Sequence, residues 1–356
     1  MDRSVGKITN VEAGRGIAAL LVVLFHTSNY YFSTPKYWTG DAFHGLFLFG
    51  HAGVEFFFVL SGYIMLTVHR KDVGKPSKVL PFARKRFLRI YPFFWVVLAV
   101  TVVLIFAMPS LGQAAWRQPL EILQSALLVG KEPLDAVVFV SWSMWHEIVF
   151  YGFCALVIGL PRVGIPAFVI WTLICAAQPF LGFTPPWPDY MTRFINVLFA
   201  FGVAGAMALE RWRIPAPRLV LAAGAVLFLA TGLALDYSTF LPEWTSRLLF
   251  GAGAVLALVG GVEAERSGLL TAPKWLVALG AASYAIYLTH ILTLTFVAKL
   301  AVKLGLPQIL PAPVAFVLLA LSATLGGVAV HKLLELRVNR AAADLLKQRP
   351  KTPVLV

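Results

Sequence analysis

The chain has 356 residues, of which 59% are hydrophobic and 13% charged, and its mean hydropathy is +0.79. This composition excludes a soluble globular protein. The net charge of +13 would suggest nucleic-acid binding in a soluble protein, but here the basic residues gather between apolar segments, as expected from membrane topology.

Ten apolar segments predict ten membrane-spanning helices, since a hydrocarbon core about 30 Å thick needs roughly 20 apolar residues per helix. In chain order they cover residues 10–32, 46–68, 90–110, 139–160, 164–184, 193–210, 219–235, 246–263, 274–298 and 314–334. Residues 120–130 are apolar but too short to span, which favours an interfacial or re-entrant helix. We therefore predict an all-α polytopic membrane protein, with a transmembrane domain over residues 1–335 and a cytoplasmic tail over 336–356.

The distribution of Lys and Arg predicts the orientation of these spans. An even number of spans places both termini on one side, and with the termini inside, 22 basic residues face the cytoplasm and seven face outward. This bias predicts cytoplasmic termini and a multi-pass protein of the inner membrane. The first residues, MDRSVGKITN, lead directly into Glu12 and Arg15, so we expect them to be the retained start of the first span.

The first span contains two ionisable residues, Arg15 and His26, that need a partner or a function in the membrane. Their spacing of eleven residues is three turns plus about 20°, so both lie on one helix face, separated by roughly 16 Å. Arg15 alone is also explained by snorkelling or by pairing with Glu12, and His26 alone by a hydrogen bond between helices.

The second span places His51 and Glu55 one turn apart, on a helix whose Gly53, Ser61 and Gly62 permit close approach of a neighbour. A carboxylate among aromatic and aliphatic side chains is costly unless it is paired, which favours a functional or site-supporting Glu55. His51 lies nearer the outer end of the span.

The segment HRKDVGKPSKVLPFARKRFLR is strongly basic, which the positive-inside rule and attraction to anionic lipid both explain. Its residues Arg84, Arg86 and Arg89 directly precede Tyr91 and the third span. Arginine binds phosphate in a bidentate manner, so a nucleotide or phosphate role for Arg86 and Arg89 is the alternative to lipid attraction.

Polar stripes occupy the fourth and ninth spans. In the fourth, Ser143, Glu147 and Tyr151 recur on one face, with His146 beside them. The ninth places Ser283, Tyr287 and His290 on one face, with Tyr284 adjacent. Ser61, Ser283 and Tyr284 are explained by hydrogen bonds between helices. The two cysteines, Cys154 and Cys175, lie in apolar runs and indicate packing rather than a disulfide or a metal site.

These motifs together resemble the membrane-bound acyltransferase family 3, in particular its exopolysaccharide O-acetyltransferases. The resemblance covers nearly the whole chain. Its motifs are R-x10-H (Arg15, His26), GVEFFFVLSGY (53–63), R-x-x-R (Arg86, Arg89) before Tyr91 and Pro92, SWSMWHE (141–147) and SYAIYLTH (283–290).

The resemblance implies ten core spans, cytoplasmic acetyl-CoA as the acyl donor, and a glycan or small glycosylated product as the acceptor. It also implies that Arg15 and His26 are essential and that Arg86 and Arg89 contact the CoA phosphates. Some relatives carry an extra periplasmic hydrolase-like domain. This chain ends about 20 residues after its last predicted span, so we expect direct presentation of acetyl to the acceptor.

We predict that His26 acts as general base and that Glu55 or Glu147 orients its ring, although a covalent acetyl-histidine remains an alternative. The cofactor is predicted to contact Arg15, Arg86, Arg89, Tyr91 and Ser143. The acceptor, a glycan or lipid-linked oligosaccharide, is predicted to contact His146, Tyr151, Tyr287 and His290. No metal and no nucleic acid are expected, and membrane lipid surrounds the protein. The alternatives are a macrolide or glycolipid acceptor, a secondary transporter and a non-catalytic scaffold.

Overall fold

The computed structural model describes residues 8–32, 37–38, 42–130, 135–181, 187–237 and 241–347. Within these ranges the chain is helical and forms no β-strand, as the composition predicts. Ten helical segments are long and apolar enough to cross a membrane. Their bounds are Thr9–Phe32, Leu48–Asp72, Pro76–Ala107, Phe139–Gly159, Pro161–Leu181, Asp189–Arg211, Pro217–Tyr237, Glu243–Arg266, Lys274–Lys303 and Ala312–Leu346. The predicted all-α fold with ten spans is confirmed.

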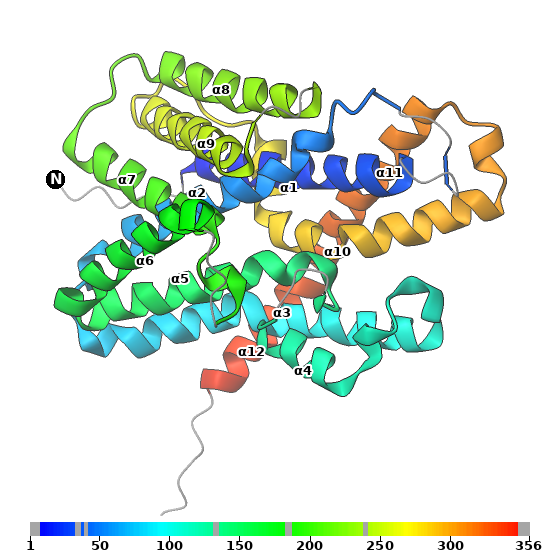
Figure 1. Cartoon of the computed structure of the whole chain (residues 1–356), viewed down its shortest axis with the longest axis horizontal. Coiled ribbons are helices and arrows are strands. Elements are labelled where there is room, and N and C mark those ends of the chain that lie inside the picture. Colours follow the sequence, from blue (N-terminus) through cyan, green and yellow to red (C-terminus); the bar gives the residue numbers. More distant parts are fainter. Residues whose placement is uncertain are drawn as a thin grey trace, which may run out of the picture.

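Twelve α-helices form the described part of this framework (Figure 1). They are α1 (Thr9–His26), α2 (Gly53–His69), α3 (Val79–Ala107), α4 (Pro119–Leu127), α5 (Trp142–Gly159), α6 (Pro161–Leu181), α7 (Val197–Arg211), α8 (Pro217–Tyr237), α9 (Glu243–Arg266), α10 (Lys274–Lys303), α11 (Ala312–Val330) and α12 (Leu336–Lys347). A π-helical segment, Thr27–Phe32, extends α1. A second one, His331–Glu335, joins α11 to α12.

The third span begins earlier than the predicted residue 90, because α3 starts at Val79. The arginines expected in a loop, Arg86 and Arg89 among them, therefore project from the first three turns of a helix. Arg, Lys, Leu and Ala are strong helix formers, and Pro81 is tolerated in the first turn, so this basic segment continues the apolar helix without a break. The positions of the arginines around α3 therefore determine which of their side chains point toward the other helices.

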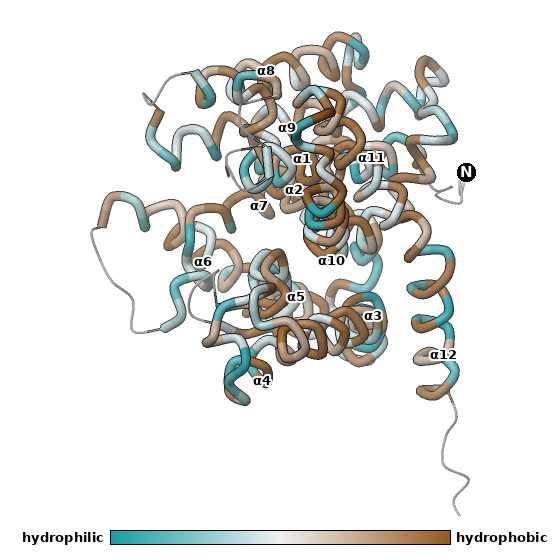
Figure 2. The backbone as a smooth tube through the Cα atoms, turned by 90° about the vertical axis from the view of Figure 1, so that its right-hand side faces the viewer, coloured by the Kyte–Doolittle hydropathy of each residue, from teal (hydrophilic) through white to brown (hydrophobic). Residues whose placement is uncertain are grey.

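The last span also extends further than predicted. The helical chain continues beyond residue 334 through the second π-helical segment into α12, which contacts α3. Hydrophobic and hydrophilic residues follow one another along the turns of α12, as Figure 2 shows. Residues 336–347 of the predicted tail therefore form a helix, while 348–356 lie outside the described residues. The predicted short helix near residues 120–130 corresponds to α4, which is too short to span.

The helices around the polar residues form a closely packed group. α1 packs against α10, α2 against α7, and α10 contacts α3. In both views α8 and α9 lie on the side of α1 and α2 that is remote from α3 and α5 (Figures 1 and 2). Polar side chains of α1, α2, α3, α5 and α10 line one cavity between these helices.

Glycine permits the closest of these contacts. A methyl group on Gly202 of α7 would overlap the carbonyl oxygen of Val59 on α2, and one on Gly62 of α2 would overlap the carbonyl oxygen of Phe199. The two backbones approach because neither side has a Cβ, as is common between membrane helices. This pairing fixes the distance from α7 to the helix that carries Ser61 and Glu55.

Replacing Gly202 by Ala is expected to destabilise the folded protein by roughly 1–3 kcal/mol, because a backbone atom must move to admit the methyl group. The thermal midpoint and the monodisperse fraction in detergent measure this loss. Gly152→Ala is the matched control, since a methyl group there meets nothing within 4 Å. Equal midpoints for the two variants would contradict the close approach of α2 and α7.

Candidate active site

Side chains from α1, α2, α3, α5, α7 and α10 enclose a cavity of about 170 Å³, which we call the arginine cavity. Its ionisable and hydroxyl-bearing lining residues are Arg15, Ser61, Arg86, Arg89, Ser143, Glu147, Tyr151, Ser283, Tyr284 and Tyr287. Three guanidinium groups face one carboxylate, so the cavity carries a net positive charge. Such a cavity is suited to an anionic ligand.

Arg86 is held on the α3 side of the cavity by aromatic rings and a histidine. Its guanidinium lies 5.5 Å from the ring centroid of Tyr151 and 5.7 Å from that of Phe82. One of its terminal nitrogens lies 3.2 Å from Nε2 of His69, whose Nδ1 lies 3.0 Å from Oδ2 of Asp72. Nδ1–H of His69 therefore donates to Asp72 while Nε2 accepts from Arg86, which requires a neutral imidazole.

Arg89 is held by a different set of groups, one turn further along α3. Its guanidinium lies 5.6 Å from the ring centroid of Tyr284, whose hydroxyl donates to the carbonyl of Ile90 at 2.7 Å. Its Nη1 is 3.9 Å from Oε1 of Glu335, and that carboxylate also accepts a hydrogen bond from Nδ1 of His331 at 2.7 Å. The second π-helical segment thus contributes a buried carboxylate beside the cavity.

Arg15 reaches the cavity from α1, and its Nη1 lies 4.0 Å from Oε2 of Glu12. The pairing with Glu12 that was one alternative explanation of Arg15 is therefore present, at the long end of the range for an ion pair. Because the same guanidinium also lines the cavity, pairing with Glu12 does not remove it from the site.

The carboxylate of the cavity, Glu147, accepts hydrogen bonds from two hydroxyl groups. The Tyr151 hydroxyl donates to Oε1 at 2.5 Å, and the Ser61 hydroxyl donates to the same atom at 3.3 Å. Ser143, Glu147 and Tyr151 all line the cavity, so the shared face predicted for the fourth span is present. Glu147 is thereby fixed between α2 and α5.

One end of the cavity is closed by a hydroxyl pair. The hydroxyl oxygens of Ser143 and Tyr287 lie 2.8 Å apart, and the Tyr287 hydroxyl donates to the carbonyl of Val140 at 2.8 Å. These bonds join the start of α5 to the middle of α10. His290 lies one turn beyond Tyr287, with its ring centroid 6.1 Å from that of Tyr287.

Two buried imidazoles meet at this point. Nε2 of His290 lies 3.1 Å from Nδ1 of His26, which is also 2.9 Å from the carbonyl oxygen of Val22. Nδ1 of His290 lies 3.1 Å from the carbonyl oxygen of Ile286. A carbonyl only accepts, so both Nδ1 atoms carry hydrogen, and Nε2 of His290 accepts from His26. We refer to these residues as the histidine pair.

This assignment leaves Nε2 of His26 with a free lone pair. Among the described residues, no hydrogen bond is formed by that nitrogen. A neutral imidazole whose Nδ1–H is fixed and whose Nε2 is unbonded has the arrangement of a general base.

The predicted carboxylate partner of His26 is replaced by His290. Glu147 is committed to Tyr151 and Ser61, and the buried Glu55 lies 3.9 Å from Nδ1 of His51. Val22 and His290 instead provide the acceptors for Nδ1 of His26. The sequence does not indicate this contact, because the two histidines are more than 260 positions apart in the chain.

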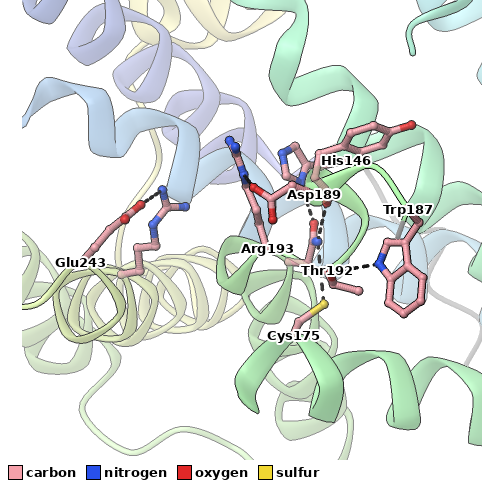
Figure 3. Close-up of polar contacts among 10 residues, drawn as sticks. His146, Cys175, Trp187, Asp189, Thr192, Arg193 and Glu243 are labelled. Carbon is pink, nitrogen blue, oxygen red and sulfur yellow. Dashed lines mark hydrogen bonds and ion pairs between the residues drawn. The ribbon is translucent and has the colours of Figure 1, made fainter. Parts of the chain in front are cut away.

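His146 lies outside the lining of the arginine cavity. Figure 3 shows its surroundings, which include Cys175 and Thr192. His146 is fully buried, and its Nδ1 lies 2.8 Å from Oδ1 of Asn196. The Asn196 amide in turn donates to the carbonyl of Tyr190 at 2.9 Å and contacts the sulfur of Cys175 at 3.8 Å. These contacts tie α5 to α6 and to the start of α7, so the geometry favours a structural His146 over the predicted acceptor contact.

Tyr91 also lies outside the cavity lining. Its hydroxyl donates to the carbonyl of Leu127 at 3.2 Å, and its ring stacks on Phe87 at 5.0 Å. Together with Trp95, which donates to the carbonyl of Ala126 at 2.9 Å, it anchors α4 to α3. The predicted cofactor contact of Tyr91 therefore has no counterpart in the cavity lining.

Residues 8–332 match the family of acyltransferase domains. The chain is also 31% identical, over 314 residues, to the exopolysaccharide production protein ExoZ of Rhizobium meliloti (strain 1021), an alignment that covers 83% of this chain and 92% of that protein. No solved structure matches the chain. The family match includes every lining residue of the arginine cavity and the histidine pair, whereas Glu335 lies beyond it.

Proposed function

Because the chain belongs to acyltransferase family 3 and is a multi-pass membrane protein, we propose that it transfers an acetyl group from cytoplasmic acetyl-CoA to a hydroxyl group of a glycan. The observation that carries this proposal is the arginine cavity, in which three guanidinium groups surround a space that ends one helical turn from the histidine pair. The guanidinium groups are suited to bind the phosphate groups of acetyl-CoA, and the histidine pair is suited to catalyse the reaction of its thioester.

The size of the cavity limits which part of acetyl-CoA it holds. A volume of about 170 Å³ is smaller than the roughly 300–1,000 Å³ of pockets that enclose a drug-sized ligand. In our proposal the pantetheine arm therefore extends into the cavity, the phosphates lie at the end of the cavity that Arg86 and Arg89 line, and the rest of the nucleotide stays outside. Arg89, whose side chain is 37% exposed, lies at the entrance of the cavity.

In the proposed reaction Nε2 of His26 takes the proton of the acceptor hydroxyl as the hydroxyl oxygen attacks the thioester carbonyl. The bond between the carbonyl carbon and sulfur then breaks, the acetyl group remains on the acceptor oxygen, and the imidazolium returns the proton to the CoA thiolate. The products are an acetyl ester and free CoA thiol. Nδ1–H of His26, bonded to Val22 and His290, keeps the lone pair on Nε2.

The identity of the acceptor is supported by the relative rather than by the cavity. That relative is named for exopolysaccharide production, which favours a polysaccharide repeat unit or its lipid-linked precursor over a macrolide or another small glycosylated molecule. Mass spectrometry of the extracellular glycan, with and without the gene, tests this choice through loss of one acetyl mass per modified unit.

Thiol release tests the enzyme against the transporter alternative. The purified protein in nanodiscs is given acetyl-CoA and unacetylated oligosaccharide from cells lacking the gene. Free CoA and acetylated oligosaccharide are expected in equal amounts, and neither without the other substrate. A transporter built from the same intramembrane charges would produce neither product.

Replacing Arg86 or Arg89 by Ala is expected to raise the KM for acetyl-CoA about tenfold or more, because a hydrogen bond to a charged group is worth about 1.5–3 kcal/mol. The kcat at saturating acetyl-CoA should change much less. Lys85→Ala is the matched control, since Lys85 is an exposed cation of the same helix outside the cavity lining. Equal changes in the KM for acetyl-CoA in all three variants would indicate that the basic residues attract anionic lipid instead.

Cytoplasmic termini in the inner membrane are part of the proposal, supported by the bias of Lys and Arg. Ser110→Cys, in the segment after α3, should react with an impermeant thiol reagent added to spheroplasts. Ser267→Cys, in the segment after α9, should react only after permeabilisation. Both positions are exposed in the structure, and the unsubstituted protein reports any reaction of the two native cysteines. The reverse labelling pattern would invert the topology.

A further inference from the structure

A second and larger cavity, of about 390 Å³, lies within the bundle, and we call it the distal cavity. It is lined by the π-helical extension of α1, the last turns of α3, the segment that follows α3, the residues before α5 and the second half of α10. Representative lining residues are Tyr30, Thr101, Trp116, Phe139, Ile291 and Lys299. No proposed contact of acetyl-CoA involves this space.

Three helices place the distal cavity at the end of the bundle opposite to the entrance of the arginine cavity. On α3, Arg89 precedes Thr101 by twelve residues, or roughly 18 Å of helix. On α10, Tyr284 precedes Thr295 by eleven residues, or roughly 16 Å. On α1 the same order holds from Arg15 into the π-helical extension. All three helices run from the arginine cavity toward the distal cavity.

The histidine pair lies between the two cavities. Tyr30, which lines the distal cavity, stacks on the His26 ring at a centroid distance of 5.6 Å and an interplanar angle of 9°. Phe139, also in that lining, meets the His26 ring edge-on at 6.2 Å. Val140 lines the distal cavity while its carbonyl accepts the hydroxyl of Tyr287 from the arginine cavity. The dividing wall is thus a few side chains thick.

The lining of the distal cavity is aromatic and hydroxylic rather than aliphatic alone. Its hydroxyl and amide groups come from Tyr30, Tyr31, Tyr37, Thr101, Ser110, Gln113 and Thr295, and Lys299 is its cation within the described residues. A lipid tail needs none of these groups. A sugar ring has an apolar face of C–H bonds and a polar rim, which match the flat face and the hydroxyl of a tyrosine.

We propose that the distal cavity binds the sugar unit of the acceptor and presents its hydroxyl to His26 from the end of the bundle opposite to the donor. This inference rests on the proposed acetyl transfer and adds the acceptor site to it. Donor and acceptor then never share an entrance: the thioester arrives through the arginine cavity, the hydroxyl arrives past Tyr30 and Phe139, and they meet at the wall that the histidine pair forms.

Chemical blocking after folding tests the proposal. Gln113→Cys, at the exposed rim of the distal cavity, is purified in nanodiscs and modified with a bulky methanethiosulfonate reagent. The KM for unacetylated oligosaccharide from cells lacking the gene should rise at least about tenfold, a loss of about 1.4 kcal/mol in binding, while the KM for acetyl-CoA stays unchanged. Removal of the label by dithiothreitol should restore the original KM.

Two controls separate the possible failures. Ser267→Cys, modified in the same way, carries the label on a segment that lines neither cavity and should keep both KM values. If the unsubstituted protein fails to acetylate the oligosaccharide, the proposed function is wrong. If it is active and the label on Gln113→Cys leaves the acceptor KM at the value of the unlabelled variant, or raises the KM for acetyl-CoA, the distal cavity is not the acceptor site and a lipid chain becomes its occupant.

Discussion

Replacing His26 by Ala is expected to lower kcat for acetyl transfer by roughly 10²- to 10⁴-fold, the usual contribution of a general base. Nε2 of His26 is the unbonded nitrogen of the histidine pair, so no neighbouring group described in the structure replaces it. Acetyl-CoA binding should persist, because His26 does not line the arginine cavity. The measurement is acetyl transfer and acetyl-CoA binding by purified, monodisperse protein.

His26→Gln is the companion variant, since its amide retains hydrogen bonding without a titratable nitrogen. A histidine that only bridges two membrane helices contributes about 0.6 kcal/mol on average, which predicts slightly lower expression and a modest loss of activity. Retention of more than about a tenth of the unsubstituted rate by either variant would rule out the base. Loss of acetyl-CoA binding together with activity would instead indicate a damaged fold.

The fold was predictable because a bilayer imposes one strong rule. Apolar segments of roughly 20 residues must be helices, and charges mark where they end. The rule gives the wrong helix boundary where the charged residues at the end of an apolar segment are themselves strong helix formers. Arg86 and Arg89 were therefore expected in a loop, although they lie on α3, and their direction into the cavity depends on that helix.

The site was predictable where its residues share a helix. Ser143, Glu147 and Tyr151 recur at four-residue spacing, so their common face follows from the period of the helix, and all three line the arginine cavity. The neighbouring residue His146 was predicted to contact the acceptor, but it faces Asn196 instead. A difference of about 100° around the helix separates the cavity from the packed side of α5.

Contacts between distant segments were not predictable in this way. His69 contacts Arg86 and Glu335 contacts Arg89, but each partner belongs to a different span from α3, and nothing in either span indicates the contact. The weak signals were local pairs, His69 with Asp72 and His331 with Glu335, each spaced for one helical turn. Part of the lining of the distal cavity, including Gln113 and Trp116, comes from a segment between two spans, and hydropathy does not predict the structure of such a segment.

Substitution of His290, the second member of the histidine pair, is also expected to lower kcat strongly. When His26 takes a proton, its Nδ1–H bond to Nε2 of His290 becomes a hydrogen bond from a charged donor, which is worth about 1.5–3 kcal/mol. His290→Leu removes that acceptor and should lower kcat by roughly 10- to 150-fold with little change in either KM. His290→Gln supplies an amide oxygen at a similar reach and should recover part of the loss.

A double-mutant cycle decides whether His290 acts through His26. If it only positions and stabilises that imidazole, adding His290→Leu to His26→Ala should cost almost nothing further, because the group that it serves is already gone. Additive losses in the double variant would mean that His290 contacts the acceptor independently, as the sequence first suggested. The rates of the four proteins, measured at saturating acetyl-CoA and oligosaccharide, therefore distinguish a positioning residue from a substrate-binding one at the same buried position.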